Sequence, residues 1–127
     1  MIGNIQGSWE LKSFEIKNPD GQVRPWGKNT RGLLVYAATG HVSVAINRDL
    51  VSTGNADKDS FDAILFYAGT YRVDGDVIKH QVTIASNLSR VGKEMLRFAE
   101  LKNDLMTLST PPESFGTATI VWRRLNA

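Results

Sequence analysis

The stretch GSWEL at residues 7–11 places Gly7 and Trp9 at the start of a run in which apolar and polar residues alternate. Side chains of a β-strand point alternately to opposite faces, so this alternation predicts a strand over residues 8–16 with one buried face. One of only three tryptophans therefore stands near the start of the first strand. A side chain of this size needs a partner to pack against, which the rest of the chain must supply.

The rest of the chain repeats the alternating pattern between turn sequences at 18–21, 39–40, 74–76 and 103–104. Strands are predicted at 8–16, 22–26, 32–38, 41–47, 67–73, 76–85, 94–102, 105–110 and 117–124. Many short antiparallel strands at close spacing are typical of an all-β sandwich or barrel.

Residues 55–69 interrupt this rhythm. Apolar residues recur there at helical spacing, namely at Phe61, Ile64, Leu65 and Ala68. With Asp57 as N-cap and Gly69 at its end, the segment predicts one short helix, docked on the sheet or across its mouth.

Three hairpins are predicted from two-residue turns at 39–40, 74–75 and 103–104. The predicted pairs are Val35 with Val44, Leu33 with Ile46, Tyr71 with Ile78, Gly69 with His80, Leu101 with Met106 and Ala99 with Leu108. Each hairpin then has one largely apolar face, which predicts the inside of the protein. Leu34 and Tyr36 fall on the opposite face, under the helix or at a subunit contact.

Tyr71 and His80 are polar interruptions of the predicted inner face. Gly69 is predicted opposite His80, where the missing side chain would leave room for a cavity. His80 is either a functional acid, base or hydrogen-bond partner, or a core histidine satisfied by Tyr71 or a backbone carbonyl.

Arg97 is the third polar residue on that face. A buried guanidinium needs an anionic partner, so Arg97 is a candidate to hold the anionic group of a ligand. Alternatively, a bulge turns Arg97 outward, or Glu94 or Glu15 pairs with it. The loop over residues 86–93 joins the strands of His80 and Arg97 and suits a mobile flap.

Composition narrows the function further. The 127 residues suit a single domain over 1–127, and the 15 basic and 13 acidic residues are scattered, which predicts no nucleic-acid partner. The absence of cysteine excludes disulfides and thiolate sites and fits a cytoplasmic location. No apolar stretch is long enough to predict a membrane span. No metal site and no cofactor are predicted, since neither a histidine–carboxylate cluster nor a phosphate-binding or dinucleotide motif is present.

In order and spacing, five stretches resemble the bacterial and fungal lipocalin-like domain family of the calycin superfamily. They are GSWELKSFEIKNPDGQV, RGLLVYAATGHVSVAI, YAGTYRVDGDVIKHQV, LRFAELKNDLMTLSTPP and VWRR. The resemblance implies an eight-stranded antiparallel barrel, closed at one end and open at the other over a ligand cavity. It also implies that Trp9 plugs the closed end beneath Arg123 or Arg124. Gln81 stands where the family pattern suggests a second histidine, so a function using a histidine pair does not carry over.

The resulting hypothesis is that the barrel binds a small, largely apolar molecule, neutral or anionic. The predicted ligand contacts are Tyr71, His80, Arg97, Val35, Val44, Ile46, Val82 and Leu108. The main alternative is an isomerase or cyclase of a small-molecule pathway in which His80 moves a proton and Arg97 stabilises negative charge. A third hypothesis is a filled barrel whose outer Leu34 and Tyr36 face pairs with a partner or forms a homodimer.

Overall fold

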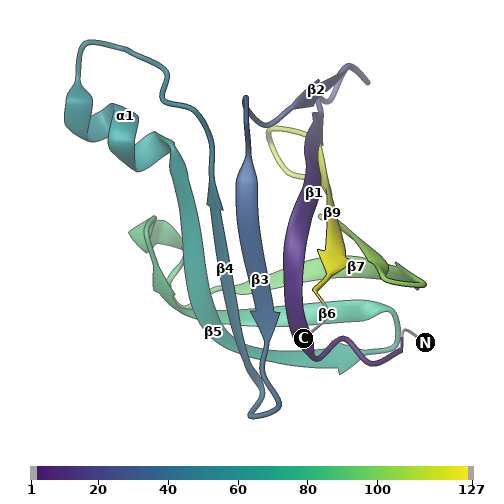
Figure 1. Cartoon of the computed structure of the whole chain (residues 1–127). Coiled ribbons are helices and arrows are strands. Elements are labelled where there is room, and N and C mark those ends of the chain that lie inside the picture. The colour runs from purple at the N-terminus through teal and green to yellow at the C-terminus, as the bar shows by residue number, and fades with distance from the viewer. Residues whose placement is uncertain (1–2, 126–127) are drawn as a thin grey trace.

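The computed structural model describes residues 3–125. This part of the chain contains nine strands and two short helices joined by loops (Figure 1). Residues 1–2 and 126–127 of the predicted domain lie outside these described residues. The elements are β1 (Gly7–Lys17), β2 (Val23–Pro25), β3 (Arg31–Tyr36), β4 (His41–Asn47), α1 (Ala56–Asp62), β5 (Ile64–Asp74), β6 (Val77–Ala85), the 3₁₀ helix η1 (Leu88–Arg90), β7 (Glu94–Lys102), β8 (Leu105–Ser109) and β9 (Thr117–Arg124).

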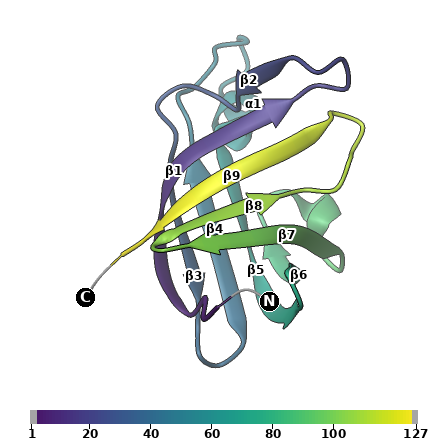
Figure 2. The ribbon, with the colours of Figure 1, turned by 90° about the vertical axis from the view of Figure 1, so that its right-hand side faces the viewer.

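Eight of these strands close into an antiparallel barrel. Their order is β1-β3-β4-β5-β6-β7-β8-β9, and β9 pairs back onto β1 from Trp9–Arg124 to Lys17–Thr117. Figure 2 shows β1 and β9 side by side. The short β2 pairs only with Glu15–Lys17 at the far end of β1. The predicted eight-stranded antiparallel barrel with one short α-helix is confirmed.

Strand β1 bends to follow the barrel wall. Trp9 and Leu11 are buried, and a bulge against β9 between Leu11 and Ser13 then shifts the alternation, so that Phe14 and Ile16 are the next buried residues. A bulge sets two residues against one and increases the local bend. One strand thereby keeps its apolar side chains inside along its whole length.

The β7–β8 hairpin has the predicted register. Leu101 pairs with Met106 and Ala99 with Leu108 across a turn at residues 103–104. Asn103 has a φ of 57°, a left-handed conformation that asparagine adopts more readily than most residues.

The predicted register of the β3–β4 hairpin is wrong by one residue. Tyr36 pairs with Val42, and the turn closes through a hydrogen bond from the Gly40 N–H to the Ala37 carbonyl, 3.0 Å long. The loop therefore spans residues 38–40, and Gly40 ends it at a φ of 87°. Such three-residue hairpin loops end on a left-handed residue, which glycine suits.

This slip exchanges the two faces of β3, because a one-residue shift turns every side chain over. Leu34 and Tyr36 lie inside the barrel, 0% and 1% exposed. Val35 points to the outer face, so its predicted place in the ligand-facing wall is wrong. The predicted outer contact face of Leu34 and Tyr36 is wrong for the same reason.

The β5–β6 turn consists of residues 75–76 rather than 74–75, with Gly75 at a φ of 62°. The register is therefore displaced by two residues, which keeps Ile78, His80 and Val82 on their predicted inner face but changes their partners. Tyr71, not Gly69, lies opposite His80. Gly69 pairs with Val82 beside a bulge, so it does not create the predicted space across from His80.

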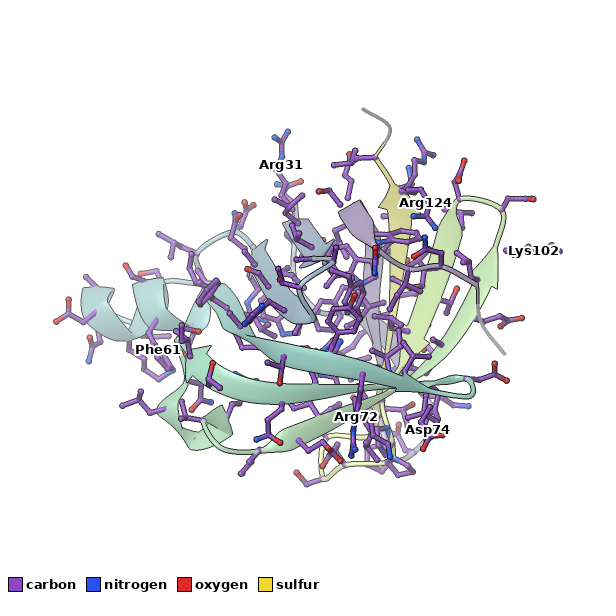
Figure 3. All side chains as sticks on the ribbon, turned by 90° about the horizontal axis from the view of Figure 1, so that it is seen from below. Arg31, Phe61, Arg72, Asp74, Lys102 and Arg124 are labelled. Carbon is purple, nitrogen blue, oxygen red and sulfur yellow. The ribbon has the colours of Figure 1, made fainter. Side chains whose placement is uncertain are left out.

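Helix α1 is shorter than predicted, and the predicted cap is wrong. Asn55 rather than Asp57 caps it, accepting a hydrogen bond from the Lys58 N–H at 3.1 Å. From Ile64 onward the chain is strand β5, because the run ILFY is rich in β-branched and aromatic residues and pairs with β4. No residue of α1 is buried, and Phe61, half exposed, lies on it to one side of the barrel (Figure 3).

Trp9 lies near the start of β1 and pairs with Arg124 at the end of β9, and Figure 1 shows these two strand ends at the lower end of the barrel. The Arg124 guanidinium lies 4.3 Å from the centroid of the Trp9 ring and donates hydrogen bonds to the carbonyls of Asn4, at 2.7 Å, and Gln6, at 2.9 Å. Trp9 is 0% exposed. Of the two predicted arginines, Arg124 is the one that stacks on Trp9, and Arg123 is exposed.

Candidate functional site

A cavity of about 280 Å³ opens inside the barrel at the end away from Trp9. Its walls come from the second half of β1, from β2 and η1, from the inner faces of the central strands and from the loop between β8 and β9. The residues that line it are Phe14, Ile16, Arg24, Trp26, Val44, Ile46, Leu65, Tyr67, Arg90, Met95, Arg97, Thr110, Glu113, Phe115, Ala118 and Ile120. The lining is mainly apolar, with a few polar groups, as is usual for sites that bind small molecules.

Trp26 is held in place on one side of the cavity. Its ring stacks on Phe14 with centroids 4.9 Å apart and planes 9° apart. The Arg48 guanidinium lies 4.0 Å from the Trp26 ring centroid and donates a hydrogen bond to the Trp26 carbonyl at 2.6 Å. These contacts fix Trp26 and Phe14 as an aromatic wall of the cavity.

Arg97 points into the barrel and lines the cavity. It is only 8% exposed, so the alternative in which a bulge turns it outward is wrong. Its guanidinium donates one hydrogen bond to the Leu96 carbonyl at 2.9 Å. Glu94, a predicted partner, forms an ion pair with Arg72 instead, at 3.1 Å. Within residues 3–125, no carboxylate forms an ion pair with Arg97.

Positive charge dominates the cavity. Three arginines line it, Arg24, Arg90 and Arg97, against one carboxylate, Glu113. Arg90 comes from η1, and burial together with the charge of Arg97 lowers its pKa, while the nearby Tyr67 hydroxyl raises it. Two guanidiniums thus approach the same tyrosine from different elements of the barrel.

His80 lies in the middle of a buried hydrogen-bonded chain. Its Nε2 is 2.7 Å from the Tyr36 hydroxyl, and its Nδ1 is 2.7 Å from the Tyr67 hydroxyl. All three side chains are at most 3% exposed. This hydrogen-bonded chain ends at the cavity, because Tyr67 lines the cavity together with Arg97.

Burial and the nearby positive charge keep the three hydrogen-bonded side chains in their neutral forms. Burial, helped by the positive charge of Arg97, lowers the pKa of His80 to about 3. Burial raises the pKa of Tyr36 well above its usual value, and it also raises the pKa of Tyr67, although Arg97 acts in the opposite direction. At neutral pH the imidazole and both phenols are therefore uncharged, and Arg97 is the charged group beside them.

A family model described as a lipocalin-like domain matches residues 6–125. The chain belongs to the lipocalin-like domain family. A redesigned β-barrel has a similar structure, with a TM-score of 0.51 and 13% identity over 96% of this chain and 92% of that one. A de novo designed fluorescence-activating β-barrel aligns with a TM-score of 0.48 and 12% identity over 95% and 94% of the two chains. These likenesses concern the fold alone, and no curated protein matches the chain.

Three of the eight predicted ligand contacts line the cavity of this lipocalin-like domain: Val44, Ile46 and Arg97. Four others lie in the part of the barrel that side chains fill, namely Tyr71, His80, Val82 and Leu108. The eighth, Val35, is on the outer face. Strands β4 and β7 therefore contribute side chains to the cavity, whereas His80 is connected to it only through Tyr67.

Tyr67, Arg90 and Trp26 line the cavity but were not among the residues predicted to do so. Tyr67 was placed at the junction of a predicted helix and strand, and its contact with His80 depends on the β5–β6 register. The loop predicted as a mobile flap contains η1, which Asn87 caps by accepting a hydrogen bond from the Ser89 N–H at 3.0 Å. The sequence SNLSR carries this capping signal, but it does not indicate that Arg90 lines the cavity.

No group of three or more side chains that could hold a metal ion occurs in the described part of the lipocalin-like domain. Across residues 3–125, no helix combines the length and apolar character that a membrane span requires.

Proposed function

We propose that this lipocalin-like domain binds a small, largely apolar molecule in its cavity and holds an anionic group of that molecule with Arg97. The observation that carries the proposal is the guanidinium of Arg97, which is almost fully buried at the cavity wall and has no carboxylate partner among the described residues. A buried charge without a counterion is costly, and an anionic ligand would supply the missing partner.

The rest of the cavity supports an apolar body on that ligand. Phe14, Trp26 and Ile46 contribute flat or branched apolar surface. A volume of about 280 Å³ is at the lower end of the range for ligand pockets, which favours a molecule the size of one or two fused rings. The excess of arginine over glutamate favours negative rather than positive ligand charge.

The alternative function, an isomerase or cyclase, has less support. A base that takes a proton from a substrate must come within hydrogen-bonding distance of it. Both ring nitrogens of His80 are occupied by Tyr36 and Tyr67, and the ring does not line the cavity. Catalysis by His80 would have to pass through the Tyr67 hydroxyl. A cytoplasmic location and a homodimer stay predictions.

The proposal is tested with two isosteric probes, 2-naphthoate and the neutral methyl ketone 2-acetonaphthone, titrated calorimetrically at pH 7.5. We expect 2-naphthoate to bind about tenfold or more tightly, because a charged hydrogen bond in a buried site is stronger than a neutral one. Arg97→Gln should remove this preference. Arg123→Gln, which removes the same charge from an exposed position on β9, should preserve it. Equal binding of both probes, or a preference that survives Arg97→Gln, would show that Arg97 does not hold an anion.

A further inference from the structure

We propose that Tyr67 points its hydroxyl proton into the cavity, so that Tyr67 and Arg97 together form a site that only donates hydrogen bonds, selective for a deprotonated oxygen of the ligand such as a carboxylate, enolate or phenolate. His80 and Tyr36 act as positioning residues that set this direction. The inference rests on the proposed function, since it concerns the same cavity.

The direction of the hydrogen-bonded chain starts at Tyr36. Its hydroxyl is deeply buried, and its one hydrogen-bond partner in the described structure is Nε2 of His80, 2.7 Å away. The hydroxyl proton of Tyr36 can form a hydrogen bond here only if Nε2 of His80 accepts it. The opposite direction would leave that proton unused in the interior, where an unsatisfied polar group is costly.

A neutral imidazole carries one proton, and its two nitrogens therefore have opposite roles. When Nε2 accepts from Tyr36, the proton of His80 must be on Nδ1. Nδ1 lies 2.7 Å from the Tyr67 hydroxyl and donates to its oxygen. Burial and Arg97 keep His80 neutral, so both nitrogens cannot donate at once.

Arg97 reinforces this arrangement on the cavity side. Arg97 lines the same cavity, and a positive guanidinium, which has no acceptor, favours the orientation in which the oxygen of Tyr67 rather than its proton faces the charge. Tyr67 then accepts from His80, and its own proton is left for the cavity that it lines. At this place the cavity presents an O–H group and the N–H groups of a guanidinium.

Because Tyr67 and Arg97 offer donors, the ligand must supply a hydrogen-bond acceptor. A deprotonated oxygen can accept from Tyr67 and Arg97 together, as an oxyanion does between preorganised donors. An N–H group of a ligand would find no acceptor at Tyr67 and Arg97. The cavity should therefore select the deprotonated oxygen of a weak or strong acid over an amide or amine on the same apolar body.

The first experiment reads the protonated nitrogen of His80 directly in the ligand-free wild-type protein. Long-range proton–nitrogen correlation NMR on protein labelled with ¹⁵N-histidine distinguishes the two tautomers. The chain has two histidines, and His41→Gln identifies the signals of His80. We expect the proton on Nδ1. A proton on Nε2 would overturn the inference. This test needs no ligand and no substitution of Tyr36, Tyr67 or His80.

The second experiment measures binding of 2-naphthoate and of 2-ethylnaphthalene, which has no oxygen. Tyr67→Phe should weaken 2-naphthoate about tenfold and leave 2-ethylnaphthalene unchanged, because it removes one donor to a charged acceptor. Tyr36→Phe should also weaken 2-naphthoate selectively, although Tyr36 does not line the cavity. A merely structural role of Tyr36 would weaken both probes equally.

These outcomes separate the two proposals. If 2-naphthoate binds in an Arg97-dependent way but neither tyrosine variant weakens it, this inference is wrong and the proposed function stands. If 2-naphthoate does not bind the wild-type protein, the proposed function fails and the ligand selectivity inferred here fails with it.

Discussion

Acidification should destabilise this protein through His80, the imidazole buried between two tyrosines. In the folded barrel the pKa of His80 is lowered to about 3, first by burial and second by the positive charge of Arg97. In the unfolded chain the same imidazole titrates near 6.5. Between these two values the unfolded state binds a proton that the folded state does not, so stability falls as the pH falls.

The expected magnitude follows from that difference. Each pH unit below 6.5 costs about 1.4 kcal/mol of unfolding free energy, until the pH approaches the pKa of the folded state. The contribution of His80 should therefore be a loss of about 1 kcal/mol at pH 5.5 and about 3 kcal/mol at pH 4.5, relative to pH 8. Above pH 7.5 the contribution should be nearly constant, because His80 is neutral in both states.

Urea unfolding followed by tryptophan fluorescence at pH 8, 6.5, 5.5 and 4.5 measures this loss, since Trp9 and Trp122 are buried in the folded state. Carboxylates also titrate at the acid end, so the informative quantity is the difference between wild type and His80→Gln. The variant should lose about 3 kcal/mol less than wild type between pH 8 and 4.5. His41→Gln should behave as wild type, because His41 is exposed. Equal losses in wild type and His80→Gln would refute the reasoning.

Three further substitutions test the structure, each by urea unfolding at pH 7.5. Arg124→Gln should cost about 1–2 kcal/mol, because it removes the guanidinium from the Trp9 ring together with its hydrogen bonds to backbone carbonyls. Gly69→Ala should cost about 3 kcal/mol or more, since its methyl group would overlap the backbone of β6. Leu34→Ala should cost about 2–5 kcal/mol, and Val35→Ala less than about 1 kcal/mol, because Leu34 is inside the barrel and Val35 is outside.

Each of these three stability predictions has a control variant or an outcome that would contradict it. Arg123→Gln should change stability by less than about 0.5 kcal/mol, and a loss equal to that of Arg124→Gln would contradict the stacking on Trp9. Gly21→Ala should cost only the strain of its positive φ, about 1 kcal/mol, because no atom lies where its methyl group would go. A larger loss for Val35→Ala than for Leu34→Ala would favour the register in which β3 is turned over.

Much of the barrel could be predicted from local pattern. A side-chain period of two depends only on the geometry of an extended chain, so it identifies a strand and its buried face without knowledge of its neighbours. Because β6 keeps this period, His80 was correctly predicted to point inward. For Arg97 the pattern of β7 left an outward-turning bulge open, and only its burial in the structure excludes that alternative. The turn Asn103-Asp104 also fixed its hairpin, since a two-residue loop leaves one register.

Other features depended on how the chain closes on itself. The three-residue loop before His41 reversed the face of β3, and the run ILFY became strand because it could pair with β4. The sequence does not distinguish a two-residue from a three-residue loop before His41. An apolar run as short as ILFY likewise suits both a helix and a strand. Arg123 and Arg124 are adjacent and chemically identical, and only the pairing of β9 with β1 decides which one meets Trp9.

The sequence by itself determined many antiparallel strands, typical of a sandwich or barrel, with a histidine on the inner face, because alternation and turn chemistry act between near neighbours along the chain. Only the tertiary structure decided that Tyr36, His80 and Tyr67 form one hydrogen-bonded chain that ends at a cavity, which Arg97 also lines. These residues come from β3, β6, β5 and β7, and their contact depends on the register of every strand between them. A shift of one residue in any of these pairings would turn a member of the chain to the outer face of the barrel.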